Sequence, residues 1–295
     1  MSSYVLSACS TADLPRVFFE QHHVLCIPFH YTIDGHVYPD DLYASTSPAE
    51  FFGRIKAGDE PTTSQVSVGD YLINWEPLLQ AGHDILHLTL SSGISGTYES
   101  ACIARDQLKA AYPERRIQVV DSLSASAGYG LVLRYLVELK QAGLTFDELS
   151  AWIEAHKLDV NAWFFVSDLE CLKRGGRISK TNALIATALK ICPIININVE
   201  GKLIPQSKVR TKKRAIAELA KLFVVHAENG VAYTGKCCIS HSDCLEDAKE
   251  LARQIENLVP ALAGEIMISD IGAVIGSHTG PGTVALFFMG DTRVD

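Results

Sequence analysis

Residues 91–98, SSGISGTY, have the composition of an anion-binding loop. They follow an apolar run and precede a stretch with helical spacing, so that backbone N–H groups and the positive end of a helix dipole would face one point. Hydroxyls from Ser92, Ser95 and Thr97 add hydrogen-bond donors. The segment therefore predicts a site for a carboxylate, a phosphate or a sulfate. The alternative is an ordinary strand-to-helix turn in which Ser95 is the N-cap.

A second polar segment, residues 61–67, places Thr62 and Thr63 before a predicted helix. Loops that follow parallel strands gather at one edge of a sheet, where ligands bind. Two hydroxyl-rich helix starts could therefore meet at one anion. The alternative for this segment is a solvated turn.

Two further segments carry positive charge or imidazole. Residues 172–179 place Arg174 and Arg177 on either side of a Gly-Gly pair, and arginine offers planar, permanently charged donors to a carboxylate or phosphate. Residues 275–283 place His278 among small residues, which would let a ligand approach closely. The alternatives are a basic surface loop and a histidine of the core.

The loop lacks the patterns of common enzyme sites. No lysine follows Gly96, which excludes the GxxxxGK[ST] phosphate loop, and the segment is not GxGxxG. It is one residue short of the GxSxG nucleophile elbow, and no neighbouring acid or histidine indicates a triad. Two enzyme alternatives stay open. A phosphotransferase would be stabilised by ATP or a phosphosugar, and a serine hydrolase would be labelled by a fluorophosphonate at Ser92 or Ser95.

The elements that position these segments alternate along the chain. Apolar runs predict strands at residues 24–29, 85–90 and 117–120, and helix-period segments lie between them. This alternation predicts an α/β fold whose N-terminal domain, residues 1–160, has a mostly parallel sheet flanked by helices. From residue 161 to 295 the rhythm changes to a hairpin, two helices and separated strands. This part is predicted to be an α+β domain.

Composition restricts the partners. The 295 residues include 26 basic and 34 acidic side chains, and the net charge of −8 does not favour nucleic acid as a partner. The densest basic run, residues 208–214, is either a solvated helix start or a docking patch for an acidic protein. Eight cysteines show no CxxC pair and no zinc spacing, so we expect reduced thiols, no metal and no cofactor. With no signal peptide or membrane-spanning stretch in view, we expect a cytoplasmic protein.

Taken together and in this order, the segments resemble the DegV family of fatty-acid-binding proteins, and the resemblance spans nearly the whole chain. It implies an α/β N-terminal domain, an α+β C-terminal domain and a long acyl chain buried between or within them. The matching stretches are residues 10–15, 62–65, 91–98, 172–179 and 275–283. The chain departs from the family pattern at Cys9, where an acid is frequent, and at Cys192, where a lysine is common.

The resemblance also implies a function and a division of roles. A carrier of this family delivers a long-chain fatty acid to a separate kinase protein, which makes the acyl phosphate, and is not itself an enzyme. Thr63 and Ser92 would hold the carboxylate. Gly93 and Ser95, from the same loop as Ser92, would also contribute to carboxylate binding, and His278 would lie in the same polar network. Arg174 and Arg177 would lie at the rim, where the kinase could dock. Transient contact with a membrane is compatible with this role.

Overall fold

The first half of the chain is built on a parallel sheet in the computed structural model, which describes residues 4–167, 169–178 and 191–294. The strand order is β2-β1-β6-β7, and neighbouring strands all run parallel. Every residue of β6 is buried, as expected of an apolar strand covered on both faces. The strands of this sheet, sheet A, are β1 (Tyr4–Cys9), β2 (Leu25–Ile27), β6 (Asp84–Thr89) and β7 (Ile117–Asp121).

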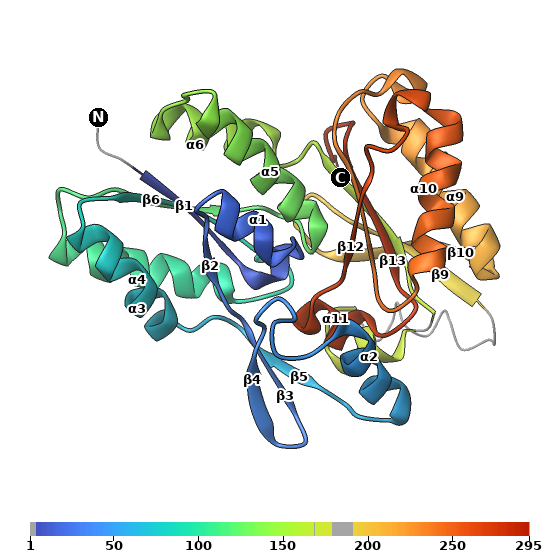
Figure 1. Ribbon diagram of the computed structural model, residues 1–295, viewed down its shortest axis with the longest axis horizontal. Helices are drawn as coiled ribbons and strands as arrows, with labels where there is room; N and C mark the ends of the chain where they lie inside the picture. Colours follow the sequence, from blue (N-terminus) through green and yellow to red (C-terminus); the bar gives the residue numbers. More distant parts are fainter. Residues whose placement is uncertain (1–3, 168, 179–190, 295) are drawn as a thin grey trace.

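Helices cover both faces of sheet A. Figure 1 shows α3 and α4 on one side of it and α5 and α6 on the other. Two of these helices begin with capping boxes, formed by Ser67 with Asp70 and by Thr145 with Glu148, which fix where each helix starts. The helices are α1 (Arg16–Gln21), α3 (Val68–Gln80), α4 (Thr97–Ala111), α5 (Ala127–Gln141) and α6 (Phe146–His156).

A small antiparallel sheet, sheet B, projects from the first half (Figure 1). Its strand order is β4-β3-β5, and Thr63 of β5 pairs with Tyr31 of β3. The prediction that Thr63 lies at a helix start is therefore wrong, because antiparallel pairing places it on a strand. The elements here are β3 (His30–Ile33), β4 (His36–Pro39), α2 (Pro48–Ala57) and β5 (Thr62–Ser64).

The second half forms a mixed six-stranded sheet, sheet C, in the order β10-β9-β8-β13-β11-β12. Helices α9 (Lys212–His226) and α10 (Leu245–Leu258) cover one face, while α5 contacts β8, β11 and β13. The strands are β8 (Val160–Phe165), β9 (Ile191–Ile197), β10 (Leu203–Arg210), β11 (Cys237–His241), β12 (Met267–Asp270) and β13 (Val284–Met289).

The predicted α/β fold with a parallel sheet and flanking helices is confirmed. Sheet membership changes between β7, which ends at Asp121, and β8, which begins at Val160. Because α5 contacts strands of both sheets A and C, the two halves share packing, and the boundary at residue 160 stays a prediction. Short 3-10 helices are η1 (Ser10–Ala12), η3 (Gly230–Ala232) and η4 (Pro260–Leu262).

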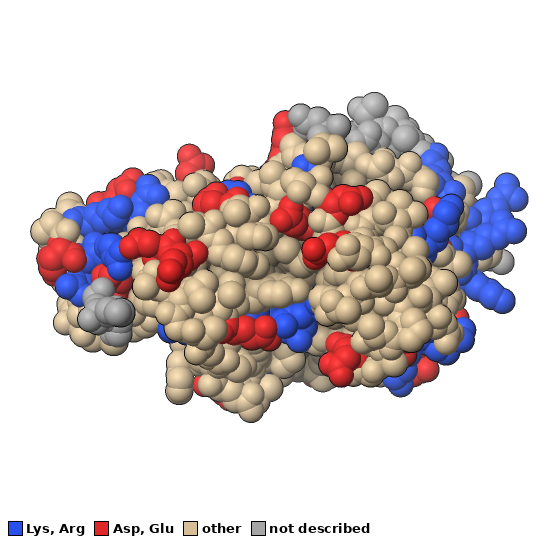
Figure 2. Space-filling view, turned by 90° about the horizontal axis from the view of Figure 1, so that it is seen from above, with Lys and Arg blue, Asp and Glu red and all other residues tan. Residues whose placement is uncertain are grey.

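Basic side chains gather at two ends of the face shown in Figure 2. One of these ends is formed by β10 and α9, which carry the basic run of residues 208–214. Helix α9 begins at Lys212 after an N-cap at Thr211, so the run does include a helix start. Within the described ranges, no helix is long and apolar enough to cross a membrane.

Candidate functional site

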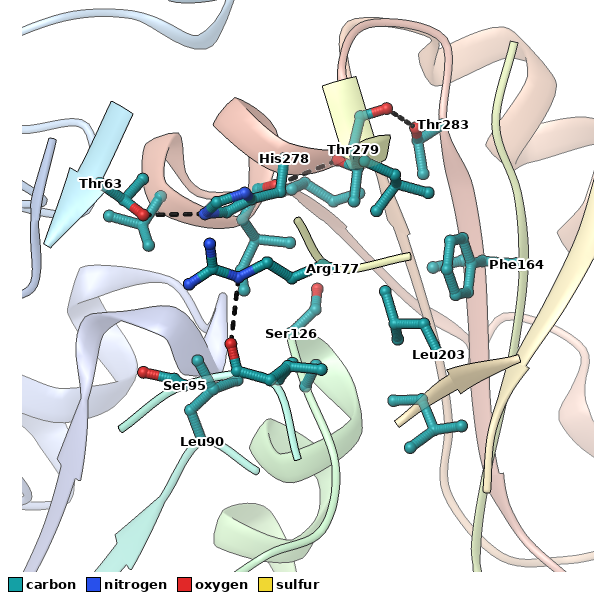
Figure 3. A pocket seen from close by; sticks show the side chains of 18 of the residues that line it. Thr63, Leu90, Ser95, Ser126, Phe164, Arg177, Leu203, His278, Thr279 and Thr283 are labelled. Atoms are coloured by element: carbon teal, nitrogen blue, oxygen red, sulfur yellow. Dashed lines mark hydrogen bonds between the residues drawn. The ribbon is translucent and has the colours of Figure 1, made fainter. Parts of the chain in front are cut away.

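A pocket lies where sheets A, B and C approach one another. It encloses about 740 Å³ of space free of protein atoms, part of it open to solvent. Figure 3 shows Thr63 and Ser95 on one side of the pocket and Phe164 and Leu203 on the opposite side. The pocket therefore has a polar end and an apolar end.

The apolar end has few free hydrogen-bonding groups. Thr279 and Thr283 line it, but their hydroxyls donate to the carbonyls of Ile275 and Thr279 at 3.2 and 3.0 Å. A ligand in this part would meet mostly hydrocarbon, which suits an aliphatic chain. The apolar residues of the lining include Phe29, Leu90, Phe164, Ile197, Leu203 and Phe287.

The polar end is organised around His278, which lies on α11 (Ala273–Thr279). Its Nε2 is 2.8 Å from the Thr63 hydroxyl on β5, so this contact joins the second half of the chain to sheet B. Its Nδ1 is buried and has no hydrogen-bond partner among the described residues. A Cβ at Gly175 would lie 2.1 Å from Nδ1, and only glycine leaves room for the ring.

Burial sets the protonation of His278. Desolvation, together with the smaller effect of the positive charges of Arg177 and Arg174, lowers the pKa of the imidazole to about 4. The ring is therefore neutral at pH 7. Since a buried N–H without an acceptor is rarer than a buried unused lone pair, we assign the proton to Nε2, which donates to Thr63. The Thr63 hydroxyl is then free to donate its own proton into the pocket.

Arg177 supplies a positive charge at this end. It follows α7 (Glu170–Arg174), and its Nε donates to the Ile94 carbonyl at 3.1 Å while Nη1 donates to the Gly175 carbonyl. Burial lowers the pKa of the guanidinium, because desolvation disfavours its charge. No carboxylate of the described chain forms an ion pair with it, so its known acceptors are neutral carbonyls.

Ser95 is the serine of the predicted loop that lines the pocket. Its backbone N–H donates to the Ser91 carbonyl at 3.2 Å, and its Oγ accepts the Thr97 N–H at 3.3 Å. With its oxygen already used as an acceptor, the hydroxyl proton can point to a ligand. The N-cap of α4 is Gly96, so Ser95 is not the cap that the alternative interpretation expected.

The other two loop residues of the prediction lie elsewhere. The side chain of Ser92 is exposed and is not part of the lining, and its backbone N–H donates to Asp121 at 3.1 Å. Gly93 faces the turn between β9 and β10, where a Cβ would lie 2.5 Å from the Glu200 carbonyl oxygen. The structure therefore brings Ser95, and not Ser92, to Thr63 and His278, and gives Gly93 a packing role.

The two arginines of the predicted rim differ in position. Arg177 lines the pocket, as Figure 3 shows, whereas Arg174 pairs with Glu60 at 3.1 Å and keeps a third of its side chain exposed. Only Arg174 thus has the place expected of a rim residue. The apolar run of residues 183–189, which the sequence offers as a further wall of the pocket, lies outside the described residues.

Sequence reasoning missed two polar residues of the lining. Gln65 donates to the Ser100 hydroxyl at 2.8 Å and so ties the end of β5 to α4. Ser126 lies in the left-handed region at φ 54° and donates to the buried carboxylate of Asp13. Gln65 stood beside the predicted threonines and could have been included. Nothing in the local pattern singled out Ser126.

The two family departures fall on buried positions away from the lining. Cys9 contacts Tyr71 and His87 beneath sheet A, and Cys192 is buried on β9. Neither side chain lines the pocket. In the described part of the chain, no group of three or more His, Cys, Asp or Glu side chains is placed to hold a metal ion.

Comparison with known proteins matches this geometry to one family. Residues 9–291 match the family model described as "Uncharacterised protein, DegV family". A DegV domain-containing protein of Clostridium perfringens is 37% identical over 297 residues, which cover 99% of each chain. A solved DegV family protein from Thermus thermophilus, described as binding fatty acid, has a TM-score of 0.86 at 29% identity and covers 99% of this chain and 100% of its own.

A second solved structure, a DegV lipid-binding protein from Thermotoga maritima, is 30% identical with a TM-score of 0.82, over 99% of this chain and 100% of that one. These matches extend over the pocket residues of both halves of the chain. They agree with the resemblance seen in the sequence. The chain belongs to the DegV family.

Proposed function

We propose that this protein binds a long-chain fatty acid and presents the carboxylate to a separate kinase that forms the acyl phosphate. In this proposal Thr63 and Ser95 donate hydrogen bonds to the carboxylate, Arg177 balances its charge, and His278 orients Thr63. The acyl chain occupies the apolar end, toward Phe164 and Leu203. Ser92 and Gly93, which lie outside the lining, have no direct contact with the ligand.

The observation that carries the proposal is the charge of Arg177 at one end of an apolar pocket. A half-buried guanidinium whose acceptors among the described residues are neutral carbonyls is stabilised when an anion arrives. The two hydroxyls provide short, directional donors beside it, and the opposite end offers hydrocarbon. A ligand that satisfies both ends has an acidic head and an aliphatic tail.

The energetics assign different roles to the two ends. Burial of one CH₂ contributes about 0.8 kcal/mol, so a chain of roughly 14 methylenes contributes about 11 kcal/mol before the costs of association. The tail therefore supplies most of the affinity. The polar end determines which way round the ligand lies and discriminates acids from neutral lipids.

The ligands of related proteins and the exposure of one pocket residue support the choice of ligand and its presentation to a partner. The Thermus thermophilus and Thermotoga maritima proteins are described as binding fatty acid and lipid. Gln65 of the lining is exposed, which would leave the head group within reach of a partner's active site. We also propose a cytoplasmic location, a reducing compartment in which the eight cysteines would be kept as thiols.

Native mass spectrometry of the purified protein, followed by denaturing lipid extraction, tests the proposal. We expect one fatty acid per chain. After lipid is removed, palmitate should raise the melting temperature, because a ligand that binds only the folded state stabilises it. Hexadecanol, which has the same tail and no charge, should raise it less. A protein that contains no lipid and responds to neither compound would contradict the proposal.

A further inference from the structure

A buried polar network lies beneath sheet A, next to the head-group loop but outside the pocket. Its centre is the hydroxyl of Tyr71 on α3, which is 3.0 Å from Thr97 Oγ1, 3.3 Å from His87 Nε2 and 3.4 Å from Cys9 Sγ. His87 continues the network through Nδ1, 2.9 Å from the Ser7 hydroxyl. All of these side chains are buried, so no bulk water competes for their hydrogen bonds.

The network is uncharged and rigidly packed. Burial lowers the pKa of His87 to about 3 and raises the pKa of Cys9 to about 12, so both groups are neutral at pH 7. Trp75 packs against both rings, with its centroid 4.6 Å from that of Tyr71 and 5.1 Å from that of His87. The direction of the Tyr71 hydroxyl is thereby fixed by its surroundings.

Thr97 connects this network to the pocket. Its side chain contacts Tyr71, and its backbone N–H donates to Ser95 Oγ at 3.3 Å. Thr97 is also the first residue of α4, so fixing it fixes the end of the loop. Loss of the Tyr71 contact would release the group that keeps the Ser95 oxygen occupied as an acceptor.

We propose that Tyr71 is a positioning residue for head-group binding, which acts through Thr97 to aim the Ser95 hydroxyl at the ligand carboxylate. The proposal rests on the proposed function, since it assumes that Ser95 donates to a fatty acid. The proposal assigns a role to a tyrosine that does not line the pocket. Loss of the Tyr71 hydroxyl should therefore weaken recognition of the acid group and leave recognition of the tail unchanged.

The test compares palmitate with methyl palmitate in displacement of a fluorescent fatty acid from lipid-free protein. Tyr71→Phe removes only the hydroxyl, and a neutral hydrogen bond contributes about 0.5–1.5 kcal/mol, so palmitate binding should weaken about threefold to tenfold. Methyl palmitate binding should change less than twofold. Tyr129→Phe is the matched control, because this buried tyrosine bonds Thr11 and the Cys9 carbonyl and not Thr97.

Thr97→Val removes the other side of the same contact and keeps the backbone N–H. It should reproduce the selective loss, and the double variant with Tyr71→Phe should be no weaker than the more affected single variant. Equal losses for acid and ester, or an equal effect of Tyr129→Phe, would overturn the positioning role. If neither compound displaced the probe from the unaltered protein, the proposed function itself would fail. This result can be distinguished from failure of the positioning role alone.

Discussion

Two serines in the loop between β6 and α4 differ in what their hydroxyls face. Ser95 lines the pocket, whereas Ser92 is exposed on the outer side of the same loop. Because a hydrogen bond to a charged group contributes about 1.5–3 kcal/mol, Ser95→Ala should weaken palmitate binding about tenfold to a hundredfold. Ser92→Ala should leave binding within about twofold.

Displacement of a fluorescent fatty acid measures both variants on the same scale. The pair controls for loop flexibility, since each removes one hydroxyl from the same segment. A larger effect of Ser92→Ala than of Ser95→Ala would restore the assignment made from the sequence and would require a different loop conformation in the ligand-bound state.

The sequence was sufficient to locate this loop but not to choose between its serines. Composition identified a Gly/Ser turn after a buried strand, and β6 and α4 confirm both neighbours. The orientation of each hydroxyl depends on contacts far away in sequence, such as the donation from Ser91 Oγ to the Gly201 carbonyl at 2.8 Å. Local patterns contain no information about such contacts.

At the level of elements, the end of α7 packs closely against α11 because Gly175 leaves room for the ring of His278. A Cβ at Gly175 would lie 2.1 Å from His278 Nδ1, closer than any side chain can accept. Gly175→Ala should therefore displace the imidazole from Thr63 and weaken palmitate binding about tenfold, a loss of about 1.4 kcal/mol. The measurement is the same displacement assay, with thermal unfolding to check the fold.

Gly53→Ala on α2 provides the matched control, because a Cβ there would meet no atom within 4 Å. An alanine in a helix interior is usually favourable, so this variant should bind normally and be slightly more stable. Normal palmitate binding by Gly175→Ala would show that His278 is not required in its present place.

Strands with a strong apolar pattern could be predicted from the sequence, and the short strands of sheet B could not. The strands near residues 85–90 and 117–120 have strong apolar patterns and appear as β6 and β7. The three strands of sheet B contain three or four residues each, and Thr62–Ser64 is polar throughout. Two threonines favour a strand weakly, but the segment has no apolar alternation, and its strand conformation is set by pairing with β3.

At the scale of the whole molecule, the polar end of the pocket is assembled from both halves of the chain. Thr63 and Ser95 come from the first half, and Arg177 and His278 come from the second. Sequence patterns gave each segment separately. The sheet-edge argument suggested that the two hydroxyl-rich segments meet, and the convergence of all four segments followed only from the family resemblance. Because neither half contains all four groups, head-group binding should require the intact fold.

Under the proposed function, the same assembly would separate ligand binding from partner docking. Arg174 lies outside the lining, yet its charge helps to lower the pKa of His278, so it is near the head-group end. If a kinase meets the carrier at this end, Arg174→Ala should reduce acyl-phosphate formation about tenfold while palmitate binding changes less than twofold. Hydroxylamine trapping with ATP and a bacterial fatty acid kinase measures the product.

Arg253→Ala is the control for loss of one positive charge, because Arg253 is exposed on α10, and α10 provides none of the described lining. It should leave both product formation and binding unchanged. Raised ionic strength should reduce turnover with the unaltered protein and affect Arg174→Ala less, since the attraction that salt screens is already weakened. Equal losses of binding and turnover in Arg174→Ala would instead place this arginine in contact with the fatty acid, and would move the docking surface to another part of the molecule.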